Sequence, residues 1–162
     1  LVLNAGDVLT RYGDPGGEYY GDIKHESFRV EAQTDDKGNP ISGAVTVYAL
    51  GEKREHTGVK TIVFRGGEGN DTLSVGSGVD ARLDVDGGLG RDTFFIQGGS
   101  SDSEIRGGKG NDTFIGGDVS GITYLGGEGN DSYRGGAGGA IIDMGTGQDV
   151  IVAGVGNDQI TV

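Results

Sequence analysis

The sequence predicts an all-β protein. Most of it is a right-handed parallel β-roll, a solenoid, preceded by a small β-rich capping or lead-in segment. Three observations predict this fold. A glycine-rich nonapeptide recurs through residues 66–162, its copies are regularly spaced, and no segment shows the 3.6-residue period of an amphipathic helix. We expect residues 1–60 to form the lead-in segment and residues 61–162 to form the roll.

The nonapeptide has four strong copies and two weaker ones. The strong copies are GGEGNDTLS from Gly66, GGLGRDTFF from Gly87, GGKGNDTFI from Gly107 and GGEGNDSYR from Gly126; the weaker ones are MGTGQDVIV from Met144 and AGVGNDQIT from Ala153. Each copy has an aspartate in its sixth position and an apolar or aromatic residue in its eighth. Glycines in the first, second and fourth positions allow backbone angles that a Cβ would penalise. The first six residues are therefore predicted to form a tight loop, and the last three a short strand.

The spacing of the copies predicts two stacked sheets. The strong copies begin 21, 20 and 19 residues apart, about two nonapeptides, and a weaker phrase fills each gap. A chain that alternates loop and strand at this period places equivalent strands side by side in every turn. Two apolar ladders should then face each other. One is Leu73, Phe94, Phe114, Tyr133 and Ile151, and the other is Val85, Ile105, Tyr124, Ile142 and Ile160.

The sixth-position aspartates predict a metal-binding edge. Asp71, Asp92, Asp112, Asp131 and Asp149 should stack along one edge of the roll. Inward-pointing carbonyl oxygens and a carboxylate form an all-oxygen ligand set, which suits Ca²⁺ rather than Zn²⁺ or copper. One ion is expected between each pair of neighbouring loops, so five loops predict about four calcium ions. The predicted metal-ligating residues are Gly66, Glu68, Gly69, Asp71, Gly87, Leu89, Gly90, Asp92, Gly107, Lys109, Gly110, Asp112, Gly126, Glu128, Gly129, Asp131, Gly147, Asp149 and Asp158.

The opposite edge is predicted to hold few calcium ions or none. The sixth positions of its loops are assigned to Asp80, Ser103, Gly121 and Ala140, and most of these lack a carboxylate. A better copy follows at Ala153 and ends in Asp158. Asp102 and Asp118 are out of register with the loops, so we expect them to be solvated.

On these motifs the repeat region resembles the RTX β-roll of toxins, proteases, lipases, epimerases and giant adhesins secreted by Gram-negative bacteria. The resemblance covers about three-fifths of the chain, and four copies match without a fault. It implies a calcium-loaded parallel β-roll that is disordered before export and folds outside the cell. It therefore implies a secreted, extracellular or cell-surface location. It does not define the activity of the parent protein, because one scaffold can host many functions.

Composition and charge narrow the function classes. Of the 36 glycines, 27 lie from Gly66 onward, and both prolines precede that point. The chain has no cysteine and no run of 18 apolar residues, so neither disulfides nor a membrane span is expected. The formal net charge of −12 disfavours nucleic acid as a partner, whereas four bound Ca²⁺ would reduce it to −4.

The residues before the repeats read as β structure. Residues 26–34, 44–50 and 59–64 are the strand candidates, and residues 35–40 between the first two form a turn. The last of these strands should lead into the first loop and cover that end of the roll. Residues 1–3 are a short apolar strand candidate without an obvious partner. We expect them to cover the open end at Ile142 and Ile160 of a neighbouring copy, giving a head-to-tail array.

Two function classes follow from this reading. The favoured class is a calcium-binding structural or adhesive module, not an enzyme, of a secreted or cell-surface bacterial protein. The alternative is a calcium-triggered folding or secretion module attached to an enzyme whose catalytic domain lies elsewhere. Tyr12, Tyr19 and Tyr20 are a candidate surface for stacking on carbohydrate. Because the chain begins at Leu1 without methionine or signal peptide and ends in mid-strand, we expect it to be part of a longer protein.

Overall fold

The computed structural model describes residues 1–4 and 25–161 of the 162-residue chain. Within these residues the chain forms strands, turns and bends but no helix, and so it shows no helix that could cross a membrane. The strands are β1 (Val2–Asn4), β2 (Ser27–Thr34), β3 (Pro40–Ala49), β4 (Glu52–His56), β5 (Thr61–Glu68), β6 (Thr72–Val75), β7 (Arg82–Leu89), β8 (Thr93–Ile96), β9 (Glu104–Lys109), β10 (Thr113–Gly116), β11 (Thr123–Glu128), β12 (Ser132–Arg134), β13 (Ile141–Thr146), β14 (Val150–Val152) and β15 (Gln159–Thr161).

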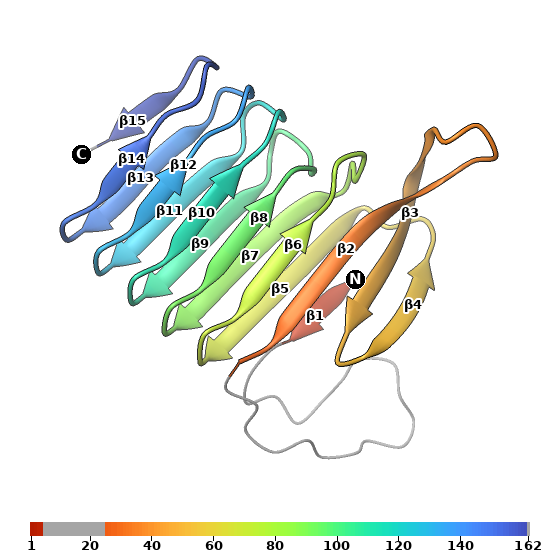
Figure 1. Cartoon of the computed structure of the whole chain (residues 1–162), viewed down its shortest axis with the longest axis horizontal. Coiled ribbons are helices and arrows are strands. Elements are labelled where there is room, and N and C mark those ends of the chain that lie inside the picture. Colours follow the sequence, from red (N-terminus) through yellow and green to blue (C-terminus); the bar gives the residue numbers. More distant parts are fainter. Residues whose placement is uncertain (5–24, 162) are drawn as a thin grey trace.

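The strands form two sheets, and in both sheets they follow one another along the long axis of the molecule (Figure 1). The seven-stranded sheet has the order β1-β5-β7-β9-β11-β13-β15, and the eight-stranded sheet has the order β14-β12-β10-β8-β6-β2-β3-β4. All neighbouring strands of the seven-stranded sheet are parallel. In the eight-stranded sheet the neighbours between β14 and β2 are parallel. From β5 onward, the chain alternates between the sheets and advances one strand in each circuit. This is the parallel β-roll that the sequence predicts.

The register confirms both predicted apolar ladders. Phe94 is paired with Leu73 on one side and with Phe114 on the other, and Tyr124 is paired in the same way with Ile105 and Ile142. Because side chains alternate between the two faces of a strand, these residues fill the space between the sheets. Their exposed fractions do not exceed 2%. The ladder residues of the last strands, Ile151 and Ile160, are less buried.

Aromatic rings form a continuous row through this core. Consecutive ring centroids lie 4.8–6.4 Å apart, in edge-to-face, stacked and tilted arrangements. Such pairs contribute about 0.5–1.5 kcal/mol each beyond the burial of their area. The row therefore couples successive turns from β2 to β12. Its members are Phe28, Phe64, Phe94, Phe114, Tyr124 and Tyr133.

The predicted hairpin before the repeats is present. β2 and β3 are antiparallel, and in the turn between them Asp35 Oδ1 accepts backbone N–H bonds from Lys37 at 2.9 Å and Asn39 at 2.8 Å. The sequence did not predict β4, whose residues are mostly charged and exposed. β4 forms the outer edge of the eight-stranded sheet, where charged side chains discourage pairing with another chain.

The first strands belong to the same two sheets as the repeats. β1 pairs with β5 and β2 with β6, both in parallel, one turn ahead of the first nonapeptide. Leu3 is aligned with Phe64 and is 6% exposed, and the terminal amine of Leu1 donates a hydrogen bond to the carbonyl oxygen of Thr61 at 2.9 Å. Residues 1–3 therefore have a partner within the chain, in a strand that is not nearby in the sequence. The division of the chain at residue 60 stays a prediction.

Candidate metal centre

Five aspartates form a ladder along one edge of the roll. They lie in the loops of residues 66–71, 87–92, 107–112, 126–131 and 144–149, which we call the carboxylate edge. In each aspartate, Oδ1 accepts the backbone N–H of the equivalent residue one turn earlier, at 2.8–2.9 Å. Each carboxylate therefore ties its own loop to the preceding turn. The aspartates are Asp71, Asp92, Asp112, Asp131 and Asp149.

Four of these carboxylates have a second oxygen that is buried without a hydrogen-bond partner among the described residues. They are Asp71, Asp92, Asp112 and Asp131, whose exposed fractions are at most 2% and whose Oδ2 atoms lack partners. A buried ionised carboxylate without a partner is very costly, because low-dielectric surroundings do not replace the water that it loses. A cation beside each Oδ2 would remove this penalty.

The first glycine of each strong copy keeps the space beside the unpartnered oxygen open. A Cβ on Gly87 would lie 2.3 Å from Asp92 Oδ2 and 2.5 Å from the carbonyl oxygen of Gly107 in the next loop. No side chain fits there without displacing both oxygens. Each gap between loops therefore presents a carboxylate oxygen from one loop and a carbonyl oxygen from the next. The same arrangement recurs at Gly66, Gly107 and Gly126.

The fourth glycines allow the loops to stack at backbone contact. Their φ angles lie between +129° and +147°, the region that favours glycine. A Cβ at this position would come within 1.5–1.8 Å of the carbonyl oxygen of the equivalent glycine one turn earlier. The glycines for which the structure shows this contact are Gly90, Gly110, Gly129 and Gly147; Gly69, in the first loop, has the same positive φ.

Burial raises the pKa of the central carboxyl groups. Loss of hydration, followed by repulsion from Asp112 and Asp71, raises the pKa of Asp92 from its ordinary 3.8 to about 7, although the N–H of Asp71 works against this shift. Burial likewise raises the pKa of Asp112 to about 6, with a smaller contribution from Asp131. The pKa values of Asp71 and Asp131 are also raised, chiefly by burial. Without a cation, these buried carboxyl groups therefore bind protons at higher pH than ordinary aspartates do.

This predicts that calcium-stripped protein is more stable at pH 5 than at pH 8. Folded Asp92 and Asp112 keep their protons up to about pH 7 and pH 6, whereas an unfolded aspartate loses its proton near pH 3.8. Their contribution to stability is fully present below about pH 4 and is lost as the pH rises through 6 and 7. Circular dichroism of stripped protein between pH 5 and pH 8 should show the β signal falling, and Asp92→Asn should flatten this dependence. A β signal that grows with pH would contradict the prediction.

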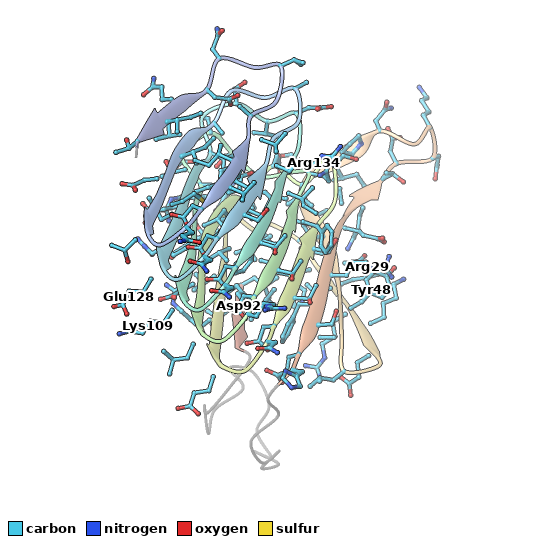
Figure 2. All side chains as sticks on the ribbon, turned by 60° about the vertical axis from the view of Figure 1, so that its left-hand side comes forward. Arg29, Tyr48, Asp92, Lys109, Glu128 and Arg134 are labelled. Atoms are coloured by element: carbon cyan, nitrogen blue, oxygen red, sulfur yellow. The ribbon has the colours of Figure 1, made fainter. Side chains whose placement is uncertain are left out.

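The ligands that the edge offers are oxygens, most of them from the backbone. The side chains in the third position of the loops, such as Lys109 and Glu128, stand outside the edge, whereas Asp92 lies within it (Figure 2). Third-position residues can therefore contribute only carbonyl oxygens to an ion inside the edge. No group of three or more His, Cys, Asp or Glu side chains gathers to hold a metal in the described part of the chain. One carboxylate with several carbonyls suits a hard cation such as Ca²⁺.

The ladder begins one turn earlier than the sequence indicated. The backbone N–H of Glu26 donates to Asp71 Oδ1 at 2.9 Å, and its carbonyl oxygen accepts from Thr72 at 2.7 Å, as the first four ladder aspartates do for the next turn. His25 Nδ1 accepts a hydrogen bond from the backbone N–H of Asn70 at 3.0 Å. In the same way, Asn70 Oδ1 accepts the backbone N–H of Arg91 one turn later. Residues 25 and 26 thus occupy the fifth and sixth positions of an additional turn. No glycine phrase marks this turn among the described residues.

The structure corrects the assignment of the opposite edge. Thr123 N–H donates to the carbonyl oxygen of Ser103, and Ile141 N–H donates to that of Ile122, so Ile122 and not Gly121 holds the sixth position. In the turn before Ser103, the sixth position is held by Leu83 and not by the predicted Asp80, because the N–H of Leu83 donates to Ser103 Oγ. These loops have unequal lengths, so counting six residues from the start of each phrase does not always locate the sixth position.

Asp80 has a different partner. Its carboxylate accepts bonds from Ser42 Oγ at 2.5 Å and from the N–H of Gly43 at 3.0 Å, which lowers its pKa and fastens β3 to the roll. Asp102 and Asp118 are exposed, as expected. Ser103 and Ala140 do hold sixth positions.

Asp158 is the carboxylate that holds a sixth position on the opposite edge. Its Oδ1 accepts the N–H of Ala140 at 2.8 Å, as the ladder aspartates do on the carboxylate edge. Asp158 and Asp149 are both only partly buried, and no further described loop stacks beyond either residue. Neither therefore has a closed gap of the kind that surrounds Asp92. They remain predicted ligands without the geometry of the four buried aspartates.

Fold and edge together define a parallel β-solenoid whose glycine loops present oxygen ligands for hard cations. The sequence matches the family of the RTX calcium-binding nonapeptide repeat in four copies, over residues 63–81, 86–120 and 125–142. This match confirms the predicted resemblance of the repeat region to the RTX family. Repeats of this family bind Ca²⁺ and occur in secreted bacterial proteins. Neither a curated protein nor a solved structure matches the chain.

Proposed function

We propose that the carboxylate edge binds about four calcium ions, one in each gap between neighbouring loops. The observation that carries this proposal is the set of four buried Oδ2 atoms without partners, one for each of the four gaps. In every gap a carbonyl oxygen of the next loop approaches the same glycine as the Oδ2 atom. When bound, calcium would supply the positive charge that these oxygens lack. The aspartates would hold the loops in register for it.

The biological role that we propose is structural or adhesive, in a secreted or cell-surface bacterial protein. The interior of the roll is filled by apolar ladders, and the carboxylates of one edge are committed to joining turns. This arrangement supports a rod-like building block rather than a catalytic centre. The alternative, a folding or secretion module of an enzyme, uses the same calcium edge and differs in what the parent protein carries. Tyr12, Tyr19 and Tyr20, the candidate carbohydrate surface, lie outside the described residues.

Head-to-tail assembly remains part of this proposal in a changed form. β1 already pairs with β5 of its own chain, so it cannot leave to cover a neighbour without uncovering Leu3. β1 and β15 are the two outer strands of the seven-stranded sheet. In the described structure, each has a free edge on the side away from its one neighbour. A contact between copies would therefore add β15 of one copy to β1 of the next.

The calcium proposal is tested by comparing Asp112→Ala with Asp118→Ala. Asp112 contacts the preceding turn through Oδ1 and lines its own gap through Oδ2, so its loss should weaken calcium binding at two neighbouring sites. The loss should be on the order of tenfold to a hundredfold, as for other groups that position metal ligands. Asp118 is exposed and accepts one N–H from Ala137, so its variant should bind calcium like the wild type. Calorimetric calcium titration measures both.

Asp112→Asn separates lost binding from lost folding. Its amide oxygen can still accept the N–H of Asp92, while the charge that attracts the ion is gone. We expect this variant to weaken calcium binding as Asp112→Ala does. Equal calcium affinities in the Asp112 and Asp118 variants would show that the carboxylate edge is not the binding site.

A further inference from the structure

A shallow, open hollow lies on the outer surface of the carboxylate edge, over its first three loops. Leu89, Arg91 and Lys109 line it, together with two asparagines and two glycines. The lining contains no carboxylate, although the chain has a formal net charge of −12. The hollow is therefore a local cationic surface on an acidic protein.

Both cations of the hollow are available to a ligand. Arg91 is exposed, and no ion pair includes it among residues 1–4 and 25–161. Lys109 Nζ lies 2.9 and 3.0 Å from the two carboxylate oxygens of Glu128, but both side chains are more than 60% exposed. Exposed pairs of this kind contribute little, because water and salt screen them. An anionic ligand can therefore replace Glu128 at small cost.

The remaining lining suits a sugar chain. Leu89 is 45% exposed, and it is the one large apolar side chain of the carboxylate edge that is exposed in the described structure. Asn70 and Asn111 use their Oδ1 atoms to accept backbone N–H bonds from Arg91 and Asn130. Their amide nitrogens are left as donors to hydroxyl or carboxylate oxygens.

Calcium loading would reverse the charge of the whole edge. Its five loops contain seven carboxylates and two cations, so their formal charge is −5 without metal. Four calcium ions would add eight positive charges and bring it to +3. An edge that repels polyanions when empty would then attract them, with the hollow at Arg91 and Lys109 as the contact point.

We propose that the calcium-loaded carboxylate edge binds an acidic polysaccharide at this hollow and that calcium controls the binding through the charge reversal. The proposal rests on the calcium sites of the proposed function and adds the class of partner. An extended sugar chain fits a narrow row of stacked loops, and its acidic groups and ring faces match the cations, amides and Leu89. A lipid bilayer fits less well, because this edge offers it one exposed apolar side chain.

The test uses dextran sulfate, with uncharged dextran as its control, in calcium-buffered solutions near physiological salt. The test variant is Arg91→Asn with Lys109→Thr, which introduces residue types that other loops have at the same positions, as in Asn111 and Thr146. Lys37→Gln, in the exposed turn between β2 and β3, is the matched control. Wild type and control should bind dextran sulfate in calcium. The double variant should bind it about tenfold more weakly, from about threefold for each exposed charge pair.

The outcomes separate this inference from the calcium proposal. Equal dextran sulfate binding by the double variant and wild type would overturn the inference, as would unchanged binding in a chelator or equal binding to uncharged dextran. Binding to anionic phospholipid vesicles but not to dextran sulfate would overturn it in favour of a membrane partner. If the wild type gains its β signal on calcium addition but does not bind dextran sulfate, this inference alone fails. If the wild type shows no calcium response, the proposed function fails.

Discussion

Alanine in place of Gly110 is expected to destabilise the calcium-loaded protein by more than about 4 kcal/mol, at the upper end of single substitutions. Gly110 has φ of +132°, and a Cβ there would lie 1.6 Å from the carbonyl oxygen of Gly90 in the preceding loop. Neither atom can move without separating two neighbouring turns of the carboxylate edge. Urea unfolding in excess calcium measures the loss of stability.

Gly38→Ala is the matched control for this prediction. Gly38 also has a positive φ, +83°, but a Cβ there would meet nothing within 4 Å. Its variant suffers only the backbone strain, about 1 kcal/mol. If Gly110→Ala costs no more than Gly38→Ala, the loops do not stack as closely as the structure has them.

Removal of calcium is expected to abolish the folded roll at neutral pH. Four buried carboxylates then face one another across successive turns, and a glycine-rich chain has a large conformational entropy to lose on folding. Each site stabilises the folded state by about 2.7 kcal/mol when free calcium is a hundred times its dissociation constant. Four such sites supply roughly 10 kcal/mol, comparable to the whole stability of a typical domain.

Circular dichroism during a calcium titration of stripped protein measures this dependence. We expect a cooperative gain of β signal and of thermal stability as calcium is added, since binding free energy becomes folding free energy. Magnesium is the control ion, because it demands shorter distances and gives up its water reluctantly. A stripped sample at pH 8 that keeps its full β signal and its melting temperature would contradict the account.

The sequence predicted the parts of the fold that repeat with a fixed period. Phe94 and Tyr124 lie in the ladders expected of them, because alternate side chains of the strand that follows each loop must face the core. The stacked aspartates were found in the same way, since glycines and a carboxylate at fixed spacing define the loop. The sequence could also predict which carboxylates are candidate ligands. It could not show that only four of them have a buried oxygen without a partner, because that depends on whether another loop covers the gap.

What the sequence missed depends on backbone pairing rather than on residue type. Glu26 continues the aspartate ladder through its N–H and carbonyl groups, which every residue except proline possesses. β1 joins the roll through parallel pairing with β5, which begins about 60 residues later in the chain, and no local pattern shows such a pairing. On the opposite edge, loops of unequal length moved the sixth position from Asp80 to Leu83. β4 carries mostly charged residues, which rarely mark a strand.

The central claim is that calcium lies between neighbouring loops of the carboxylate edge. A crystal structure grown in calcium, with an anomalous difference map recorded at long wavelength, tests it most directly. We predict four anomalous peaks in one row, each beside the Oδ2 atom of Asp71, Asp92, Asp112 or Asp131. Peaks mainly along the opposite edge, or well-ordered loops of the carboxylate edge without any peak, would contradict this account.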